Sequence, residues 1–335
     1  MPSISQLHTW TTVDYQNHPG QGKGICFNGN GSSIFIAISR ATLLQLAKAT
    51  GAVITSNHTT IQCTEALWDA INSQFWTTPA GGGGVFTVAR WNGAAAVINL
   101  PHTGQSSWGQ IVVNGHYWTG NYFDGTMTEL DAATGAVIIA ALNVPGANPT
   151  DPTGTIAFDA VNQNLWLTNI PNKLTRISEP FGAVTGTFFP AGVGSWGGFC
   201  IANGFLWGTD NTNNTLVKMD LNANVVQTIA LPVTAPRYIC FDGLWFWIWD
   251  DTGTVSAYNS IGSFQAQISI TVADANQEIA NDPVEGPGLV WATYGNNPYF
   301  VTQLQLIGGV LPGGGIVQGT HAGFWNAGHF GGGTK

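Results

Sequence analysis

A short pattern of apolar and polar positions recurs along most of the chain. An apolar segment runs into Asp or Asn at a tight turn, and a second segment rich in aromatic residues follows, as in ICFNGNGSSIFIA from Ile25 and ICFDGLWFWIWD from Ile239. Asn-Gly and Asp-Gly tolerate a positive φ and close β-hairpins, so each copy predicts two antiparallel strands. Seven copies occur, at intervals of 39 to 45 residues. Their turn residues are Asn28, Asp69, Asn114, Asp159, Asn203, Asp242 and Asp282.

The residues after each hairpin predict two further strands. Segments such as KLTRIS, TLVKMDL and TMTELDAATGAVIIA alternate between apolar and polar residues, which is typical of a third strand, a turn and a fourth strand. Four antiparallel strands repeated seven times predict an all-β fold, a seven-bladed β-propeller. One aromatic position of the second strand is expected to pack between neighbouring blades. It is occupied by Phe35, Trp76, Trp118, Trp166, Trp207, Trp247 and Trp291.

The two ends of the chain lie outside the repeats. We expect residues 1–19 to contain a strand, within LHTWTTVDY, that closes the ring as the outer strand of the seventh blade. The propeller is predicted over residues 20–307, and a tail rich in Gly follows over 308–335. This tail either packs across a face of the propeller or docks the chain on a partner. Its candidate docking residues are His321, Phe324, Trp325, His329 and Phe330.

The charge of the chain excludes several classes of partner. Lys and Arg together number 9 and Asp and Glu 18, a net charge of −9. Between Arg237 and Lys335 there is no Lys or Arg, so we expect neither nucleic acid nor an anionic membrane surface as a partner. No apolar stretch approaches the ~20 residues of a membrane span, and the first residues lack the basic and apolar regions of a signal peptide. We therefore expect cytoplasmic synthesis without a signal peptide and no membrane insertion.

Few residues suggest a reaction. The four cysteines have neither CxxC nor metal-ligand spacing, so buried free thiols are expected. The nucleophile elbow GxSxG, the phosphate loop GxxxxGK[ST] and the metal motif HExxH are all missing from the sequence.

At the level of individual residues, the repeats resemble the virginiamycin B lyase and NHL/YVTN group of β-propellers. Blades of that group carry a pattern like Pro-x-Gly-Ile-x-x-Asp-Gly-x-x-Leu-Trp-Phe-Thr-x-x-x-x-Asn-x-Ile. The best-matching segments here are APRYICFDGLWFW around Arg237 and PTGTIAFDAVNQNLWLTNIPNKLTRI around Ile156. The resemblance spans roughly residues 20 to 306 and implies the seven-bladed fold. Because one fold supports many functions, it does not by itself imply an activity.

The resemblance also implies where a lyase site would lie. In the lyase, a His stands two residues before the first-strand Ile and a Glu three residues after the repeat Trp, together with magnesium. The first position is occupied here by Lys23, Thr64, Gly109, Gly154, Gly198, Arg237 and Gln277. The second is occupied by Ile38, Pro79, Asn121, Asn169, Asp210, Asp250 and Tyr294. The resemblance thus implies a member that lacks the catalytic His, and we expect no lyase activity, since a general base must titrate near the working pH.

The candidate binding residues gather in the repeat frame at the mouth of the central channel. Trp108 and Trp196 stand in SWG tripeptides just before inner strands, where their rings are expected to stack on a sugar or to contact a protein, unless they pack against the rim itself. The other candidates are Arg237, Asp210, Asp250 and Trp249. The runs Asp210–Asn214 and Asp250–Gly253 offer oxygen ligands for Ca²⁺ or Mg²⁺, although both also fit ordinary turns, and we expect no cofactor.

Two functions remain open. The favoured one is a non-catalytic propeller that acts as a structural or receptor- and partner-docking component of an extracellular assembly such as a phage tail or virion. Its partners would be other structural proteins, with a cell-surface glycan or receptor as a further ligand. This expectation rests on an analogy of composition: little charge, much Gly, Asn and Thr, and release by lysis rather than by a signal peptide. The alternative is a divergent metal-dependent lyase or hydrolase that uses Asp210, Asp250 and Arg237 at the channel mouth.

Overall fold

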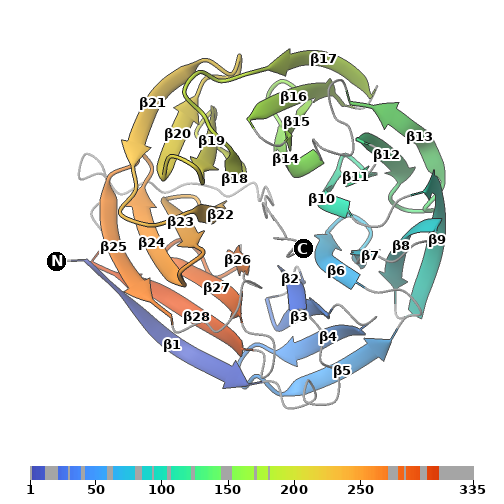
Figure 1. Cartoon of the computed structure of the whole chain (residues 1–335). Helices are drawn as coiled ribbons and strands as arrows, with labels where there is room; N and C mark the ends of the chain where they lie inside the picture. The colour runs from blue at the N-terminus through green and yellow to red at the C-terminus, as the bar shows by residue number, and fades with distance from the viewer. Residues whose placement is uncertain are drawn as a thin grey trace.

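The fold is a ring of seven β-sheets. The computed structural model describes residues 2–308, apart from 12–21, 29–30, 39–41, 59–62, 80–84, 93, 104–106, 122–124, 145–152, 170–171, 180–181, 271–277, 283 and 295–299. The described residues form seven four-stranded antiparallel sheets, arranged radially around a central axis (Figure 1). The predicted seven-bladed β-propeller is therefore confirmed. Within the described part of the chain, no helix is long and apolar enough to cross a membrane.

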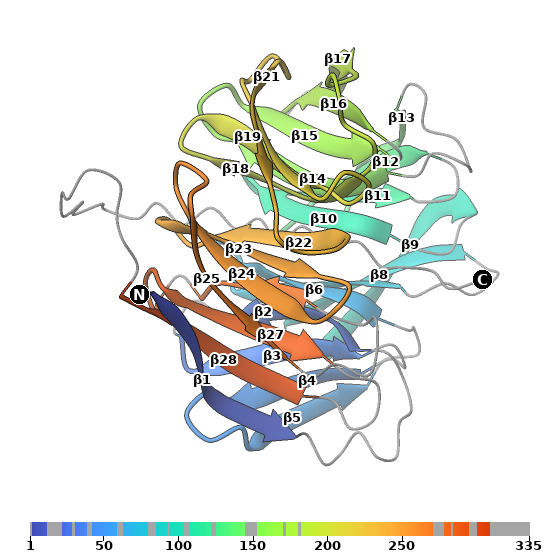
Figure 2. The ribbon, with the colours of Figure 1, turned by 60° about the vertical axis from the view of Figure 1, so that its left-hand side comes forward.

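In blades 1 to 6 the four strands follow one another outward from the axis in chain order (Figures 1 and 2). Blade 1 consists of β2 (Gly22–Phe27), β3 (Ser33–Ile38), β4 (Thr42–Ala47) and β5 (Val53–His58). Blade 2 consists of β6 (Cys63–Asp69), β7 (Gln74–Pro79), β8 (Val85–Asn92) and β9 (Ala94–Thr103). Blade 3 consists of β10 (Ser107–Val113), β11 (His116–Asn121), β12 (Thr126–Asp131) and β13 (Val137–Asn143). Blade 4 consists of β14 (Thr153–Asp159), β15 (Asn164–Asn169), β16 (Lys173–Ser178) and β17 (Ala183–Phe188). Blade 5 consists of β18 (Trp196–Ala202), β19 (Phe205–Asp210), β20 (Thr215–Met219) and β21 (Val225–Ala230). Blade 6 consists of β22 (Pro236–Phe241), β23 (Trp245–Asp250), β24 (Thr254–Asn259) and β25 (Phe264–Ser269).

The seventh blade joins the two ends of the propeller. It consists of β26 (Glu278–Ala280), β27 (Leu289–Tyr294), β28 (Phe300–Ile307) and the N-terminal strand β1 (Ser3–Thr11). Strand β1 pairs antiparallel with β28 and forms the outer edge of this blade, the place expected for the N-terminal segment. Trp10 of β1 stacks on the repeat residue Trp291, with ring centroids 5.1 Å apart. Ring closure is thus secured by strand pairing together with aromatic packing.

The alternation of strand direction gives the disc two different faces. The turns that join first to second strands and third to fourth strands lie on one face, which we call the hairpin face. The connections between second and third strands and between blades lie on the other, the linker face. On the hairpin face, Asn114 and Asn203 adopt φ of 51° and 52° and each is followed by a Gly, as the sequence predicted for tight hairpins.

The repeat aromatic residues form the contacts between blades. Trp76 stacks on Tyr117 of the next blade at a centroid distance of 4.2 Å, and Trp207 lies 4.5 Å from Phe246. The six repeat tryptophans are all fully buried, at 1% exposure or less. The core is consequently a series of clusters around the ring, each shared by neighbouring blades.

Candidate functional site

The predicted channel-mouth residues do lie at one face of the disc. Trp196 and Arg237 stand at the beginning of first strands, whereas Asp210 and Asp250 end second strands, and all four positions belong to the linker face. Trp108 lies in β10, and nothing further is described of its side chain. The tail candidates His321, Phe324, Trp325, His329 and Phe330 lie outside the described residues.

The two candidate carboxylates hold turns together. Asp210 is fully buried and accepts hydrogen bonds from the backbone N–H groups of Gly194, Ser195, Thr212 and Asn213, at 2.8 to 3.2 Å. The alternative that the sequence left open, an ordinary turn, describes this carboxylate well. Its oxygens are directed at backbone donors rather than at a ligand.

Asp250 plays the same part in the next blade. It accepts bonds from the N–H groups of Thr234, Thr252 and Thr254 at 2.8 to 3.2 Å and is 1% exposed. Its neighbour Asp251 forms an ion pair with Arg237, in which both side chains are partly exposed. Burial raises the pKa of Asp251, while Arg237 opposes that shift. Arg237 is thus a predicted site residue with a partly exposed charge, whereas its partner Asp251 was not among the candidates.

Two of the candidate tryptophans are core residues. Trp196 is 1% exposed and packs edge-to-face on Phe199, and Trp249 is fully buried against Tyr294. Of the two alternatives that the sequence left open for Trp196, packing against neighbouring residues describes this buried indole. Its first-strand position turns the indole into the space between blades, where burial of a large apolar ring is favourable.

Neighbouring inner strands lie too close together for a side chain at two of the positions where the resemblance to the lyase would place its His. A Cβ atom on Gly109 would lie 2.4 Å from the carbonyl oxygen of Gly154 in the next blade. A Cβ atom on Gly198 would lie 2.8 Å from the carbonyl oxygen of Arg237. Backbone at that distance excludes any side chain. At these two positions the wall of the channel is therefore formed by backbone alone.

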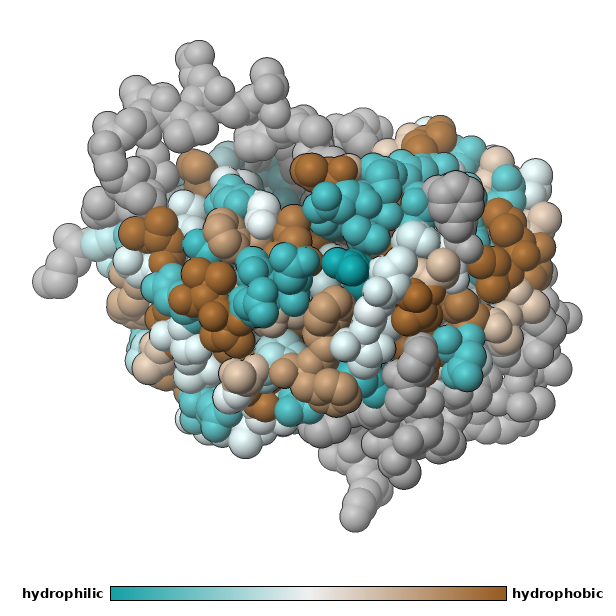
Figure 3. Space-filling model, turned by 90° about the horizontal axis from the view of Figure 1, so that it is seen from above, coloured by the Kyte–Doolittle hydropathy of each residue, from teal (hydrophilic) through white to brown (hydrophobic). Residues whose placement is uncertain are grey.

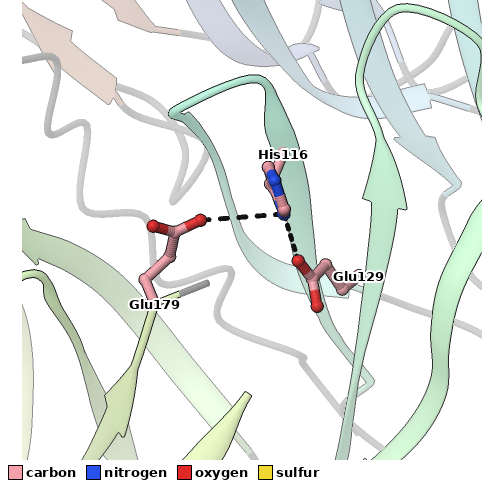
Figure 4. Close-up of side chains that lie close together, drawn as sticks. All are labelled: His116, Glu129 and Glu179. Carbon is pink, nitrogen blue, oxygen red and sulfur yellow. Dashed lines mark hydrogen bonds and ion pairs between the residues drawn. The ribbon is translucent and has the colours of Figure 1, made fainter. Parts of the chain in front are cut away.

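A second cluster of ionisable groups lies on the hairpin face, between blades 3 and 4 (Figure 4). His116 begins β11, Glu129 lies on the adjacent strand β12, and Glu179 follows β16 of the next blade. Nδ1 of His116 forms a close contact with Oε1 of Glu129 and lies 3.7 Å from Oε1 of Glu179. Both carboxylate side chains are fully buried, whereas the imidazole is 26% exposed. Among the described residues, these three form the group of His, Cys, Asp and Glu with a geometry suited to a metal ion.

The surroundings of this cluster leave negative charge poorly compensated. Oε2 of Glu129 and Oε1 of Glu179 are buried without a hydrogen-bond partner among the described residues. Burial raises the pKa of Glu129, the bond and charge of His116 lower it, and the charge of Glu179 raises it again. Asn114 donates a hydrogen bond of 2.6 Å to the other oxygen of Glu179 and thereby fixes its orientation.

A further buried carboxyl, Glu278, begins the inner strand of blade 7. The N–H groups of Gly24 and Ile25 in blade 1 donate to it, yet burial dominates and raises its pKa to about 8. Sequence reasoning missed this residue because it considered the adjacent position, Gln277.

The hairpin-face cluster was also missed, although a signal exists in the repeats. The residue paired across the strands with the repeat aromatic residue is Glu only in blade 3. In the other blades it is Gln45, Arg90, Arg176, Lys218, Ala257 and Gln303. Aligning the third strands would have singled out Glu129, but its approach to Glu179 of another blade depends on the folded ring.

Comparison with known proteins agrees with the architecture. No protein-family model and no curated protein sequence matches the chain. Among solved structures, it is similar to a virginiamycin B lyase from Staphylococcus aureus, with a TM-score of 0.73 and 16% identity over 92% of this chain and 100% of that one. It is also similar to a streptogramin B lyase, with a TM-score of 0.71 and 14% identity over 91% of this chain and 98% of that one. At this level of identity the likeness shows a common fold, the seven-bladed β-propeller of these lyases.

Proposed function

We propose that the chain is a non-catalytic propeller that serves as a structural or docking component of an extracellular assembly, such as a phage tail or virion. The observation that carries this proposal is the composition of the outer strands. None of β1, β5, β9, β13, β17, β21 and β25 contains Lys, Arg, Asp or Glu. An outer strand has a free edge, and soluble proteins commonly protect such edges with charge, especially Lys.

Several of these strands also expose large apolar side chains. Ile54 of β5, Ile138 of β13, Val226 of β21 and Phe264 of β25 are 47 to 56% exposed. An edge-on view of the disc from the top of Figure 1 shows apolar and polar residues interspersed on the rim (Figure 3). An uncharged rim with apolar side chains is suited to a neighbouring protein subunit, which would contact it through side chains or add a strand to its edge.

The structure of the linker face favours this proposal over catalysis. The carboxylates of Asp210 and Asp250 are engaged by backbone donors, and inner-strand backbone occupies the space at Gly109 and Gly198. Neither arrangement leaves a general base directed at a substrate. Docking through the rim requires no such group.

The first prediction tests the rim. Replacing Ile138 or Val226 with Lys places a charge on an outer strand and should reduce incorporation of the chain into its assembly at least 10-fold, because the charge would be buried at the contact. Thermal stability should change little, since both side chains are about half exposed in the isolated chain. Incorporation is measured as the ratio of this chain to the other subunits in purified particles.

Val161 provides the matched control for these variants. It is 86% exposed but lies in the hairpin between β14 and β15 rather than on the rim. Val161→Lys should be incorporated like the unaltered chain. Normal incorporation of folded Ile138→Lys and Val226→Lys would contradict the rim proposal, as would particles that never contain the chain.

A divergent metal-dependent lyase or hydrolase is the second candidate function. It is favoured by the similarity of the fold to the two lyases and by the Arg237–Asp251 ion pair at the linker face. The test is incubation of the purified chain with streptogramin B and Mg²⁺, followed by mass analysis. Turnover that disappears in Arg237→Ala would establish this function and replace the docking proposal; unchanged substrate would remove lyase activity of that kind.

A further inference from the structure

We propose that His116, Glu129 and Glu179 bind a divalent transition-metal ion, with Zn²⁺ as its representative, that joins blades 3 and 4 at the hairpin face. This site is separate from the linker-face residues considered for catalysis, and its role would be structural. It is independent of whether the rim docks a partner.

The first line of support is the orientation of buried oxygens. One ligand atom from each residue lies within 4.8 Å of the other two. Figure 4 shows both carboxylates directed at the imidazole from two different blades. Oε2 of Glu129 and Oε1 of Glu179 have no hydrogen-bond partner among the described residues, and buried carboxylate oxygens without partners are unfavourable. A metal ion between them would satisfy both carboxylates.

The second line of support is the charge at equivalent places in the ring. Between blades 7 and 1, Lys48 follows the third strand of blade 1, as Glu179 follows that of blade 4. There it forms ion pairs with Asp282 and Glu285 of the neighbouring blade. Between blades 3 and 4, the corresponding residue is an acid. The junction between blades 3 and 4 therefore combines two carboxylates, whereas the junction between blades 7 and 1 contains the cationic side chain of Lys48.

At the positions equivalent to Glu129, other blades carry cationic or neutral side chains. Arg176 and Lys218, which occupy the position of Glu129, lie over their repeat tryptophans at 5.6 and 5.3 Å from the ring centroids. In blade 1, two neutral side chains occupy the equivalent positions. Gln45, the counterpart of Glu129, donates a 2.9 Å hydrogen bond to Ser33, the counterpart of His116. Only in blade 3 are both positions ligands for metals. A neutral imidazole, two carboxylates and a divalent ion together have no net charge.

The donor atoms indicate the class of metal. Imidazole nitrogen with carboxylate oxygen suits Zn²⁺ and its transition-metal neighbours, whereas Ca²⁺ and Mg²⁺ prefer sites built of oxygen alone. Zinc–ligand bonds of about 2.0–2.2 Å require Nδ1 of His116 and Oε1 of Glu129 to move apart from their close contact and the more distant donors to approach, which rotation of the two Glu side chains can provide. The partial exposure of His116 allows an ion to enter and leaves room for a water molecule as a fourth ligand. The Asn114 amide would orient Glu179, as outer hydrogen bonds commonly do for metal ligands.

The experiment uses the tag-free full-length chain, stripped with a chelator and then titrated with Zn²⁺, Ca²⁺ or Mg²⁺. We expect one Zn²⁺ per chain by calorimetry and elemental analysis, and a melting temperature several degrees higher with saturating Zn²⁺ than without it. Ca²⁺ and Mg²⁺ should produce at most a small part of this shift. Co²⁺ bound at the same site should give visible d–d absorption bands.

The variants separate ligation from folding. The double variant H116S/E129Q copies the Ser33–Gln45 pair of blade 1, so it should fold while losing the Zn²⁺-dependent shift. Asn114→Gly keeps the positive φ of that turn but removes the amide, and should weaken Zn²⁺ binding by about 10- to 100-fold. The control, Glu285→Gln, alters the ion-paired junction between blades 7 and 1 and should keep the full Zn²⁺ response.

The outcomes are unambiguous. Stoichiometric Zn²⁺ binding that is lost in H116S/E129Q and in Glu179→Gln, but kept in Glu285→Gln, supports the site. Absence of Zn²⁺ binding by the unaltered chain overturns the proposal, and so does equal binding by H116S/E129Q. A preference for Ca²⁺ over Zn²⁺ would overturn the assignment of metal class.

Discussion

Replacing Trp247 with alanine lowers the free energy of unfolding by about 3–5 kcal/mol, the range for a large aromatic side chain removed from a core. Trp247 is fully buried in the cluster shared by blades 6 and 7. Like the repeat residue Trp291, it donates its Nε1–H to a carboxylate, in this case Oδ2 of Asp242 at 2.8 Å. The same oxygen accepts the N–H of Gly288 from blade 7. The indole is therefore tied to the blade junction by both packing and a hydrogen bond.

Phenylalanine variants separate these two contributions. Trp207 occupies the same repeat position and is equally buried, but its Nε1 has no acceptor among the described residues. Trp247→Phe should therefore be about 1–3 kcal/mol more destabilising than Trp207→Phe, since only the former removes a partner from a buried carboxylate. Denaturant titration of the unaltered chain and of the three variants Trp247→Ala, Trp247→Phe and Trp207→Phe measures the differences. Equal losses for the two Phe variants would show that the Asp242 bond contributes nothing.

Replacing Glu278 with glutamine stabilises the protein, and the gain increases with pH. The folded pKa of Glu278 is raised from 4.5 to about 8 by burial. A carboxyl with a raised pKa binds its proton more tightly in the folded state, so its ionisation above pH 4.5 increasingly favours unfolding until the folded group also ionises near pH 8. The stability difference between Glu278→Gln and the unaltered chain should be close to zero at pH 4.5. It should reach the order of 4–5 kcal/mol above pH 8.

Other ionisable groups near Glu278 do not obscure its titration between pH 4.5 and 8. Burial raises the pKa of Cys26, Tyr238 and Cys240 above their already high ordinary values, so they remain neutral below pH 8.5. Asp220→Asn is the control, because hydrogen bonds from Asn224 lower the pKa of this exposed carboxyl and its effect is constant above pH 6. Melting temperatures from pH 4.5 to 9 measure the trend. A difference for Glu278→Gln that does not grow with pH would show that the carboxyl is hydrated in solution.

The architecture could be predicted because its signals are local. Asn203-Gly204 forms a hairpin turn wherever positive φ is tolerated, and Trp207, the third residue of the strand that follows, marks the apolar side of that strand. A pattern that returns seven times allows one solution, since each blade must bury its faces against its neighbours. A closing strand was expected within LHTWTTVDY, because the first and last blades must be joined and this strand-like segment precedes the first repeat; β1 overlaps that segment.

The predicted site was less successful because a strand position does not specify which way burial will turn a side chain. Trp196 and Asp210 were assigned to the channel mouth from their place in the repeat, and that place is correct. The structure shows, however, that the ring packs between blades and that the carboxylate accepts four backbone hydrogen bonds.

The sequence alone therefore determined the number of blades, the strand order and the uncharged character of the outer strands, because these depend on a local pattern and on how often it recurs. Only the tertiary structure brought His116 and Glu129 to within reach of Glu179, and only it placed the Glu278 carboxyl against the backbone of Gly24. These contacts join residues of different blades. Their geometry and their electrostatics arise when the ring closes and water is excluded between sheets, which no single repeat encodes.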